Sequence, residues 1–142
     1  MKKYITNSAE STQKLASDLA QKFQNGAIIT LTGPLGAGKT TFVQGFAKAL
    51  GIKSKILSPT FVLMREYVIP NKVDARLYHL DLYRLEGMQQ INNLGLTDLF
   101  VNPKNIFLIE WADKITNLPK NKIIKIELEY LTEDSRQITL MD

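Results

Sequence analysis

The residues with the clearest chemical signal run from Gly33 to Thr40. They read GPLGAGKT and match the phosphate-binding pattern G-x-x-x-x-G-K-[ST]. The glycines allow backbone N–H groups to surround a triphosphate, because a Cβ would block that approach. Lys39 is expected to reach the β- and γ-phosphates, and the Thr40 hydroxyl is expected to bind Mg²⁺. This segment, called the P-loop below, therefore predicts a nucleotide site.

The surroundings of the P-loop support the same interpretation. An apolar run, Ala27–Leu31, precedes it, and a helical pattern begins near Lys39. This strand–loop–helix order would place the phosphates at a helix N-terminus. The expected ligands of this segment are a nucleotide and Mg²⁺. The expected binding residues of the loop are Gly33, Leu35, Gly36, Ala37, Gly38, Lys39, Thr40 and Thr41.

Two carboxylates stand where hydrolysis would need them, since that reaction requires a second Mg²⁺ contact and a group that orients water. Glu110 ends the apolar run Ile106–Ile109, and the carboxyl end of such a strand is where ligands bind in open α/β sheets. Asp81 lies in a strand-like segment, where burying an unpaired acid is costly. The structural alternatives are a turn-capping role for Glu110 and an ion pair with Arg65 or Arg84 for Asp81.

Two further residues are weaker candidates. Thr60, in the segment Ser58–Thr60 after the helix of the P-loop, could sense the γ-phosphate as switch segments do, or could simply cap a turn. Trp111 could pack in the core or at an interface, or could form a lid over the site. The residue types alone do not decide between these roles.

Composition limits the other classes of chemistry. The 142 residues suffice for one domain with a real core, and 44% hydrophobic with 23% charged residues is typical of globular proteins. The absence of cysteine excludes disulfides and thiol catalysis, and the single histidine excludes His-rich zinc sites. No apolar run reaches the length of a membrane span, and the N-terminus lacks a signal-peptide core. We therefore expect a cytoplasmic protein.

The net charge of +4 is mildly basic. Such a charge favours RNA or an acidic partner, but the lysines are not interleaved with aromatic residues and no RNA-binding motif is present. A solvated lysine-rich surface is therefore the simpler interpretation, and direct contact with nucleic acid is the alternative.

Hydrophobic periodicity predicts the first half of the fold. Lys2–Thr6 is expected to form a strand, followed by a helix over residues 9–23. Asn7 or Ser8 offers an N-cap, and Glu10 is placed to close a capping box from Asn7. The helix after the P-loop is expected to stop at Gly51, where a C′ glycine is favourable.

The second half reads mainly as strands. Residues 61–68 and 75–83 predict a hairpin, and residues 88–100 predict one or two short helices. After the apolar strand at 106–109, residues 124–130 alternate in polarity and turn into a last strand at 136–140. The sequence thus predicts a single domain over residues 1–142. Its expected class is α/β, a three-layer, P-loop NTPase-like fold with a mixed, partly parallel central sheet.

Four segments together resemble the TsaE (YjeE) family: GPLGAGKTT from Gly33, SPTF at 58–61, HLDLYRL at 79–85 and IEW at 109–111. The P-loop is shared by many ATPases, whereas the order and spacing of the other three are much more specific. The resemblance extends from about residue 8 to residue 131. Pro34 departs from the acidic residue of many members, and we expect little effect from it.

The resemblance implies a small ATPase that is required for threonylcarbamoyladenosine, the modification next to the anticodon of tRNAs that read codons beginning with A. TsaE-like proteins bind the TsaD–TsaB pair and support its turnover without transferring the carbamoyl group themselves. Contact with tRNA would then occur only through that complex.

The resemblance also implies roles for individual residues. Lys39 would contact phosphates, Thr40 and Glu110 would bind Mg²⁺, and Asp81 would be needed for hydrolysis. Thr60 would respond to the nucleotide state. The adenine would lie near Ser8 and Ala9, at the start of the first helix.

Three rival interpretations remain. A GTPase should carry Asn-Lys-x-Asp, but Asn121-Lys122 is followed by two isoleucines. A small-molecule kinase needs an acceptor site and usually an arginine-bearing lid, for which the chain leaves little room. A non-catalytic, nucleotide-dependent adaptor is opposed only by Asp81 and Glu110.

Since no arginine lies near the P-loop in sequence, we expect slow hydrolysis without partners, with Arg65 and Arg84 as internal candidates for an arginine finger.

Overall fold

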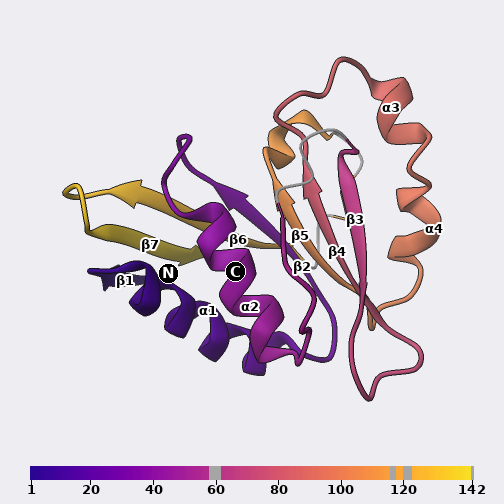
Figure 1. Ribbon diagram of the computed structural model, residues 1–142. Coiled ribbons are helices and arrows are strands. Elements are labelled where there is room, and N and C mark those ends of the chain that lie inside the picture. Colours follow the sequence, from indigo (N-terminus) through magenta and orange to yellow (C-terminus); the bar gives the residue numbers. More distant parts are fainter. Residues whose placement is uncertain (58–61, 116–117, 120–122, 142) are drawn as a thin grey trace.

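A computed structural model of the chain describes residues 1–57, 62–115, 118–119 and 123–141 (Figure 1). Within these residues, one sheet has the strand order β1-β7-β6-β2-β5-β4-β3. The strands are β1 (Lys2–Thr6), β2 (Ala27–Thr32), β3 (Met64–Val68), β4 (Arg76–Asp81), β5 (Ile106–Glu110), β6 (Ile123–Tyr130) and β7 (Arg136–Met141). The helical elements are α1 (Ala9–Phe23), α2 (Lys39–Ala49), α3 (Met88–Asn92), α4 (Leu96–Phe100) and the 3₁₀ turn η1 (Ala112–Lys114).

The sheet is mixed, as the sequence predicts. Strands β6, β2, β5 and β4 are parallel neighbours, whereas β7, β1 and β3 are added antiparallel at the two sides. Parallel strands end at a common edge of the sheet, and ligands of open α/β sheets bind outside these carboxyl ends. The P-loop leaves β2 at this edge, so the topology brings the ends of β4 and β5 beside it.

Alternating side chains divide the core between the two faces of the sheet. On one face, Leu31 and Leu108 join the buried residues of α1 and α2, including Phe46. On the other face, Ile109 and Leu80 pack with residues of α3 and α4. Figure 1 shows the two pairs of helices on opposite sides of the strands. The result is the expected three-layer α/β arrangement.

Close approach of α1 and α2 depends on one glycine. An added Cβ on Gly45 would lie 2.6 Å from the Cα and the carbonyl oxygen of Gln13 in α1. No larger residue fits there unless the helices move apart, and overpacking of this kind typically costs about 1–3 kcal/mol. The small side chain thereby fixes α1 against the helix that begins at the P-loop.

Most predicted elements are confirmed, including the helix over residues 9–23, the stop at Gly51 and the β3–β4 hairpin. The predicted capping box is wrong. Ser8 is the N-cap, and Ser11, not Glu10, closes the box through its own hydroxyl. The predicted strand at 61–68 is also too long, because Leu63 has a positive φ of 62° and β3 begins only at Met64.

Candidate nucleotide-binding site

The P-loop connects the end of β2 to the start of α2. Gly38 is the N-cap of α2, and no side chain caps the helix there. The first N–H groups of a helix have no intrahelical partner, and the helix dipole is positive at this end. The sequence therefore folds locally into an N-terminus suited to a phosphate group.

A tyrosine on β6 supports the P-loop from the side. The Tyr130 hydroxyl donates a hydrogen bond to the carbonyl oxygen of Leu35 at 3.2 Å. Gly36, with φ +78°, approaches this hydroxyl so closely that an added Cβ would lie 2.5 Å from it. The Arg136 guanidinium lies 4.3 Å from the centroid of the tyrosine ring. This support was not predicted, because in the sequence Tyr130 stands out only as the end of an alternating strand.

Lys39 points back into the P-loop. It is only 6% exposed, and its ammonium donates to the carbonyl oxygens of Gly33 at 2.5 Å and Pro34 at 3.3 Å. Burial lowers the pKa of Lys39 from its usual value, and the negative charges of Glu110 and Asp81 oppose that shift. These two carboxylates therefore favour the charged form of the lysine.

A cavity of about 250 Å³ lies between the P-loop and the carboxyl ends of β4 and β5. It brings together residues that are far apart in the chain. The lining residues are Leu35, Gly36, Gly38, Lys39, Thr40, Thr41, Asp81, Tyr83, Glu110 and Trp111. The structure thus places both candidate carboxylates at the predicted nucleotide loop.

Strand register explains why the carboxylates converge. Glu110 is the parallel register partner of Leu31 on one side and of Asp81 on the other. The two acids therefore end neighbouring strands at the same level of the sheet. Asp81 accepts a hydrogen bond from the backbone N–H of Tyr83 at 3.1 Å, which fixes the turn after β4.

Glu110 is held by His79, a residue that was not predicted to belong to the site. Its Oε2 lies 2.6 Å from Nε2 of His79, and the two residues are 3% and 0% exposed. His79 and Asp81 share one face of β4 by simple alternation, and this period was the only available signal for the histidine. The acid at the strand end is therefore partnered inside the protein.

Trp111 forms part of the cavity wall. Its ring lies 4.4 Å from the Lys39 ammonium and 5.1 Å from the Tyr83 ring, measured to the ring centroids. It adopts a positive φ of 60° directly after Glu110, and it also packs against the buried residues under α3 and α4. Trp111 thus packs against the core and also lines the cavity, and its role as a lid stays a prediction.

Ser8 and Ala9 do not line this cavity. They lie at the start of α1, near the turn that precedes β7, because the Ser135 hydroxyl donates a hydrogen bond to the Asn7 side chain at 3.0 Å. The predicted adenine contact there stays a prediction. Thr60 and the rest of the segment 58–61 lie outside the described residues.

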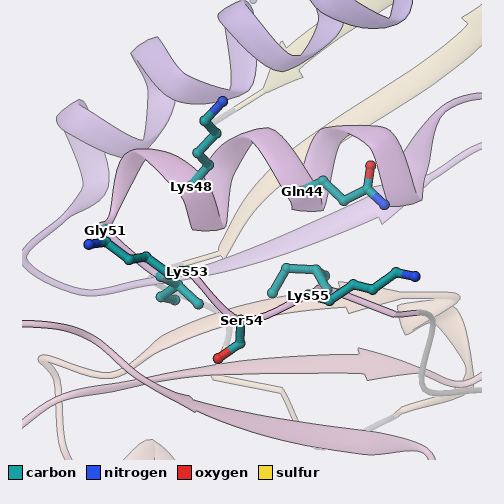
Figure 2. A pocket seen from close by; sticks show the side chains of 8 residues that line it. Gln44, Lys48, Gly51, Lys53, Ser54 and Lys55 are labelled. Carbon is teal, nitrogen blue, oxygen red and sulfur yellow. The ribbon is translucent and has the colours of Figure 1, made fainter.

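A second hollow, of about 570 Å³, lies farther along α2 (Figure 2). Figure 2 shows Gln44 and Lys48 on the helix, above Lys53, Ser54 and Lys55 of the segment that follows it. No P-loop residue and neither candidate carboxylate lines this hollow. Despite its larger volume, it lacks the helix N-terminus and the acids that nucleotide chemistry requires.

Comparison with known proteins decides the family. The model of the family described as "Threonylcarbamoyl adenosine biosynthesis protein TsaE" matches residues 6–138. The chain therefore belongs to the TsaE family. This membership links it to the biosynthesis of threonylcarbamoyladenosine in tRNA, and it confirms the family predicted from the sequence.

Several members of the TsaE family are similar over nearly the whole chain. The Bacillus subtilis protein is 38% identical over 137 residues, covering 96% of this chain and 83% of that protein. The Aquifex aeolicus protein is 37% identical over 142 residues, covering 99% of this chain and 96% of that protein. Both are named "tRNA threonylcarbamoyladenosine biosynthesis protein TsaE".

A solved structure confirms the TsaE fold. The crystal structure of Bacillus subtilis YdiB superposes with a TM-score of 0.76 at 35% identity, covering 98% of this chain and 83% of that one.

Among the helices of the described residues, none combines the length and the apolar character needed to cross a membrane.

Proposed function

We propose that this TsaE-family chain binds ATP with Mg²⁺ and hydrolyses it, and that hydrolysis acts on a complex of TsaD and TsaB during tRNA modification. The observation that carries the proposal is the convergence of Lys39, Asp81 and Glu110 on one cavity at the N-terminus of α2. Phosphoryl transfer depends mainly on positioning and electrostatic stabilisation, and this cavity offers groups for both.

The proposed binding of the triphosphate uses the P-loop and its lysine. Backbone N–H groups at the start of α2 would surround the phosphates, and Lys39 would turn from the Gly33 and Pro34 carbonyl oxygens toward them. Both carbonyl oxygens are neutral acceptors, whereas a phosphate oxygen carries a negative charge and so gives a stronger bond to the ammonium. The exchange therefore favours the nucleotide.

The residues present also fit Mg²⁺. This ion usually keeps several waters and binds through one or two carboxylates together with phosphate oxygens. The Thr40 hydroxyl and Glu110 would hold the ion, and Asp81 would orient water. When bound, Mg²⁺ neutralises charge that develops on the phosphate oxygens.

A partner is needed for rapid turnover in this proposal. No arginine lines the cavity within the described part of the chain, and neither Arg65 nor Arg84 belongs to its wall. An arginine finger typically contributes about 10³–10⁵-fold to the rate. We therefore infer that the isolated chain hydrolyses ATP slowly, and that TsaD and TsaB complete or reorder the site.

The test combines calorimetry with single- and multiple-turnover hydrolysis, using the chain with and without TsaD and TsaB. We expect Mg²⁺-dependent ATP binding, slow hydrolysis alone and faster hydrolysis with both partners. Binding without hydrolysis under every condition would instead support a nucleotide-dependent adaptor. Full activity that the partners leave unchanged would contradict the partner requirement, and an absence of ATP binding would contradict the whole proposal.

A further inference from the structure

The buried pair of His79 and Glu110 has features beyond those of an ordinary ion pair. We propose that His79 is a positioning residue, which holds the Glu110 carboxylate through Oε2 and directs the other oxygen to the Mg²⁺ side of the cavity. The effect of His79 on Mg²⁺ binding rests on the proposed function, in which the chain binds Mg²⁺ and ATP. The hydrogen bond from which it starts, 2.6 Å between Nε2 and Oε2, is independent of that function.

Burial makes a hydrogen-bond partner for Glu110 necessary. Glu110 lines the phosphate cavity, yet the residue is only 3% exposed. A buried polar atom that lacks a hydrogen-bond partner is costly. The bond from His79 satisfies Oε2 and fixes the orientation of the carboxylate group.

The second ring nitrogen identifies the tautomer. His79 Nδ1 is buried and has no hydrogen-bond partner among the described residues. A neutral ring with its proton on Nε2 donates to Glu110 and leaves only a lone pair at Nδ1. The opposite tautomer would bury an N–H group without an acceptor and could not donate to the carboxylate. The geometry therefore assigns the Nε2–H form.

Strand pairing holds the imidazole rigidly. β4 lies between β3 and β5, and His79 is in register with Arg65 on one side and Leu108 on the other. Glu110 lies two residues beyond Leu108, so it is the diagonal neighbour of His79 on the same face of the sheet. A donor on a strand that is paired on both sides can orient the acid more strictly than a loop residue could.

The experiment compares H79Q with H79L. In H79Q, the amide nitrogen of the introduced glutamine can reach Glu110 over the same number of bonds as Nε2 of histidine, whereas leucine fills a similar volume without a donor. The measured quantity is ATP affinity as a function of Mg²⁺ concentration. We expect the Mg²⁺ requirement to rise about 10- to 100-fold in H79L, as for other residues that orient metal ligands. In H79Q, the Mg²⁺ requirement should stay close to that of the unaltered chain.

A double variant separates positioning from a merely structural role. If His79 acts through the Glu110 carboxylate, H79L should add nothing to the Mg²⁺ requirement of E110Q. If H79L lowers thermal stability but leaves the Mg²⁺ requirement unchanged, or if its effect simply adds to that of E110Q, the proposal is wrong.

A spectroscopic measurement on the unaltered chain does not depend on folding of the variants. His79 is the only histidine, so its ¹⁵N imidazole signals need no assignment. We expect the pattern of the neutral Nε2–H tautomer, and the Nδ1–H pattern would overturn the proposal. Failure of ATP binding in the unaltered chain would count against the proposed function, while this signal would still report on the His79–Glu110 bond.

Discussion

The Lys39 ammonium lies 4.4 Å from the ring centroid of Trp111, on the wall of the cavity that Asp81 and Glu110 also line. A cation over the face of an indole ring is attracted by the ring quadrupole. The lysine proposed to bind phosphate is therefore in contact with the single tryptophan of the chain. This relationship links nucleotide binding to an optical signal.

ATP binding should change the emission of Trp111, because the proposed phosphate contact moves the lysine relative to the ring. Titration of the chain with ATP in a fluorimeter measures the change. In Lys39→Ala we expect ATP affinity to fall about 10- to 100-fold, the equivalent of losing one hydrogen bond to a charged group. The matched control is Lys48→Ala, an exposed lysine of the same helix outside the cavity. Equal affinity in the two variants would contradict the phosphate role.

At saturating Mg²⁺, Glu110→Ala should retain nucleotide binding but lose hydrolysis. The P-loop and Lys39 remain in place, whereas the proposed carboxylate contact to Mg²⁺ is removed. We expect the turnover rate to fall by about 100-fold or more, the usual effect of removing one group that stabilises the transition state. Phosphate release in the presence of TsaD and TsaB is the measurement. Glu129→Ala, at an exposed position of β6, serves as the control, and unchanged turnover in Glu110→Ala would refute the Mg²⁺ assignment.

Gly36→Ala should weaken ATP binding through the shape of the P-loop. The position has φ +78°, and the new Cβ would lie 2.5 Å from the Tyr130 hydroxyl. Gly95→Ala is a matched control, because its φ is +68° and no atom lies within 4 Å of the added Cβ. We expect both variants to lose about 1–2 kcal/mol of unfolding free energy, the cost of a left-handed conformation for alanine. Urea denaturation measures this loss. Only Gly36→Ala should also lose ATP affinity, and equal affinities would exclude a role for the Tyr130 contact.

The elements of the fold were largely predictable, because each depends on local patterns. The period of apolar residues predicted the helix at 9–23, and the uninterrupted apolar residues at 106–109 predicted the central strand β5. Boundaries were less predictable where polar side chains compete. Ser8, Asn7 and Glu10 all suit a helix start, and only the folded backbone shows that Ser8 and Ser11 form the box.

The candidate site was likewise predictable from the sequence only in part. The P-loop was recognisable because its residues are consecutive, and its backbone conformation follows from glycine spacing. Glu110 and Asp81 were recognisable only as acids at strand ends. Their meeting at one cavity depends on β4, β5 and β2 being neighbours in register. His79 and Tyr130 were missed, because neither carries a local signal of its contact with Glu110 or with the P-loop.

The sequence by itself determined the phosphate loop, the α/β class and the resemblance to the TsaE family, since these rest on short segments and their order. Only the tertiary structure decided which side chains surround the loop. Strand order and register are set by long-range packing, so the pairing of His79 with Glu110 and the support of Leu35 by Tyr130 exist only in the folded chain.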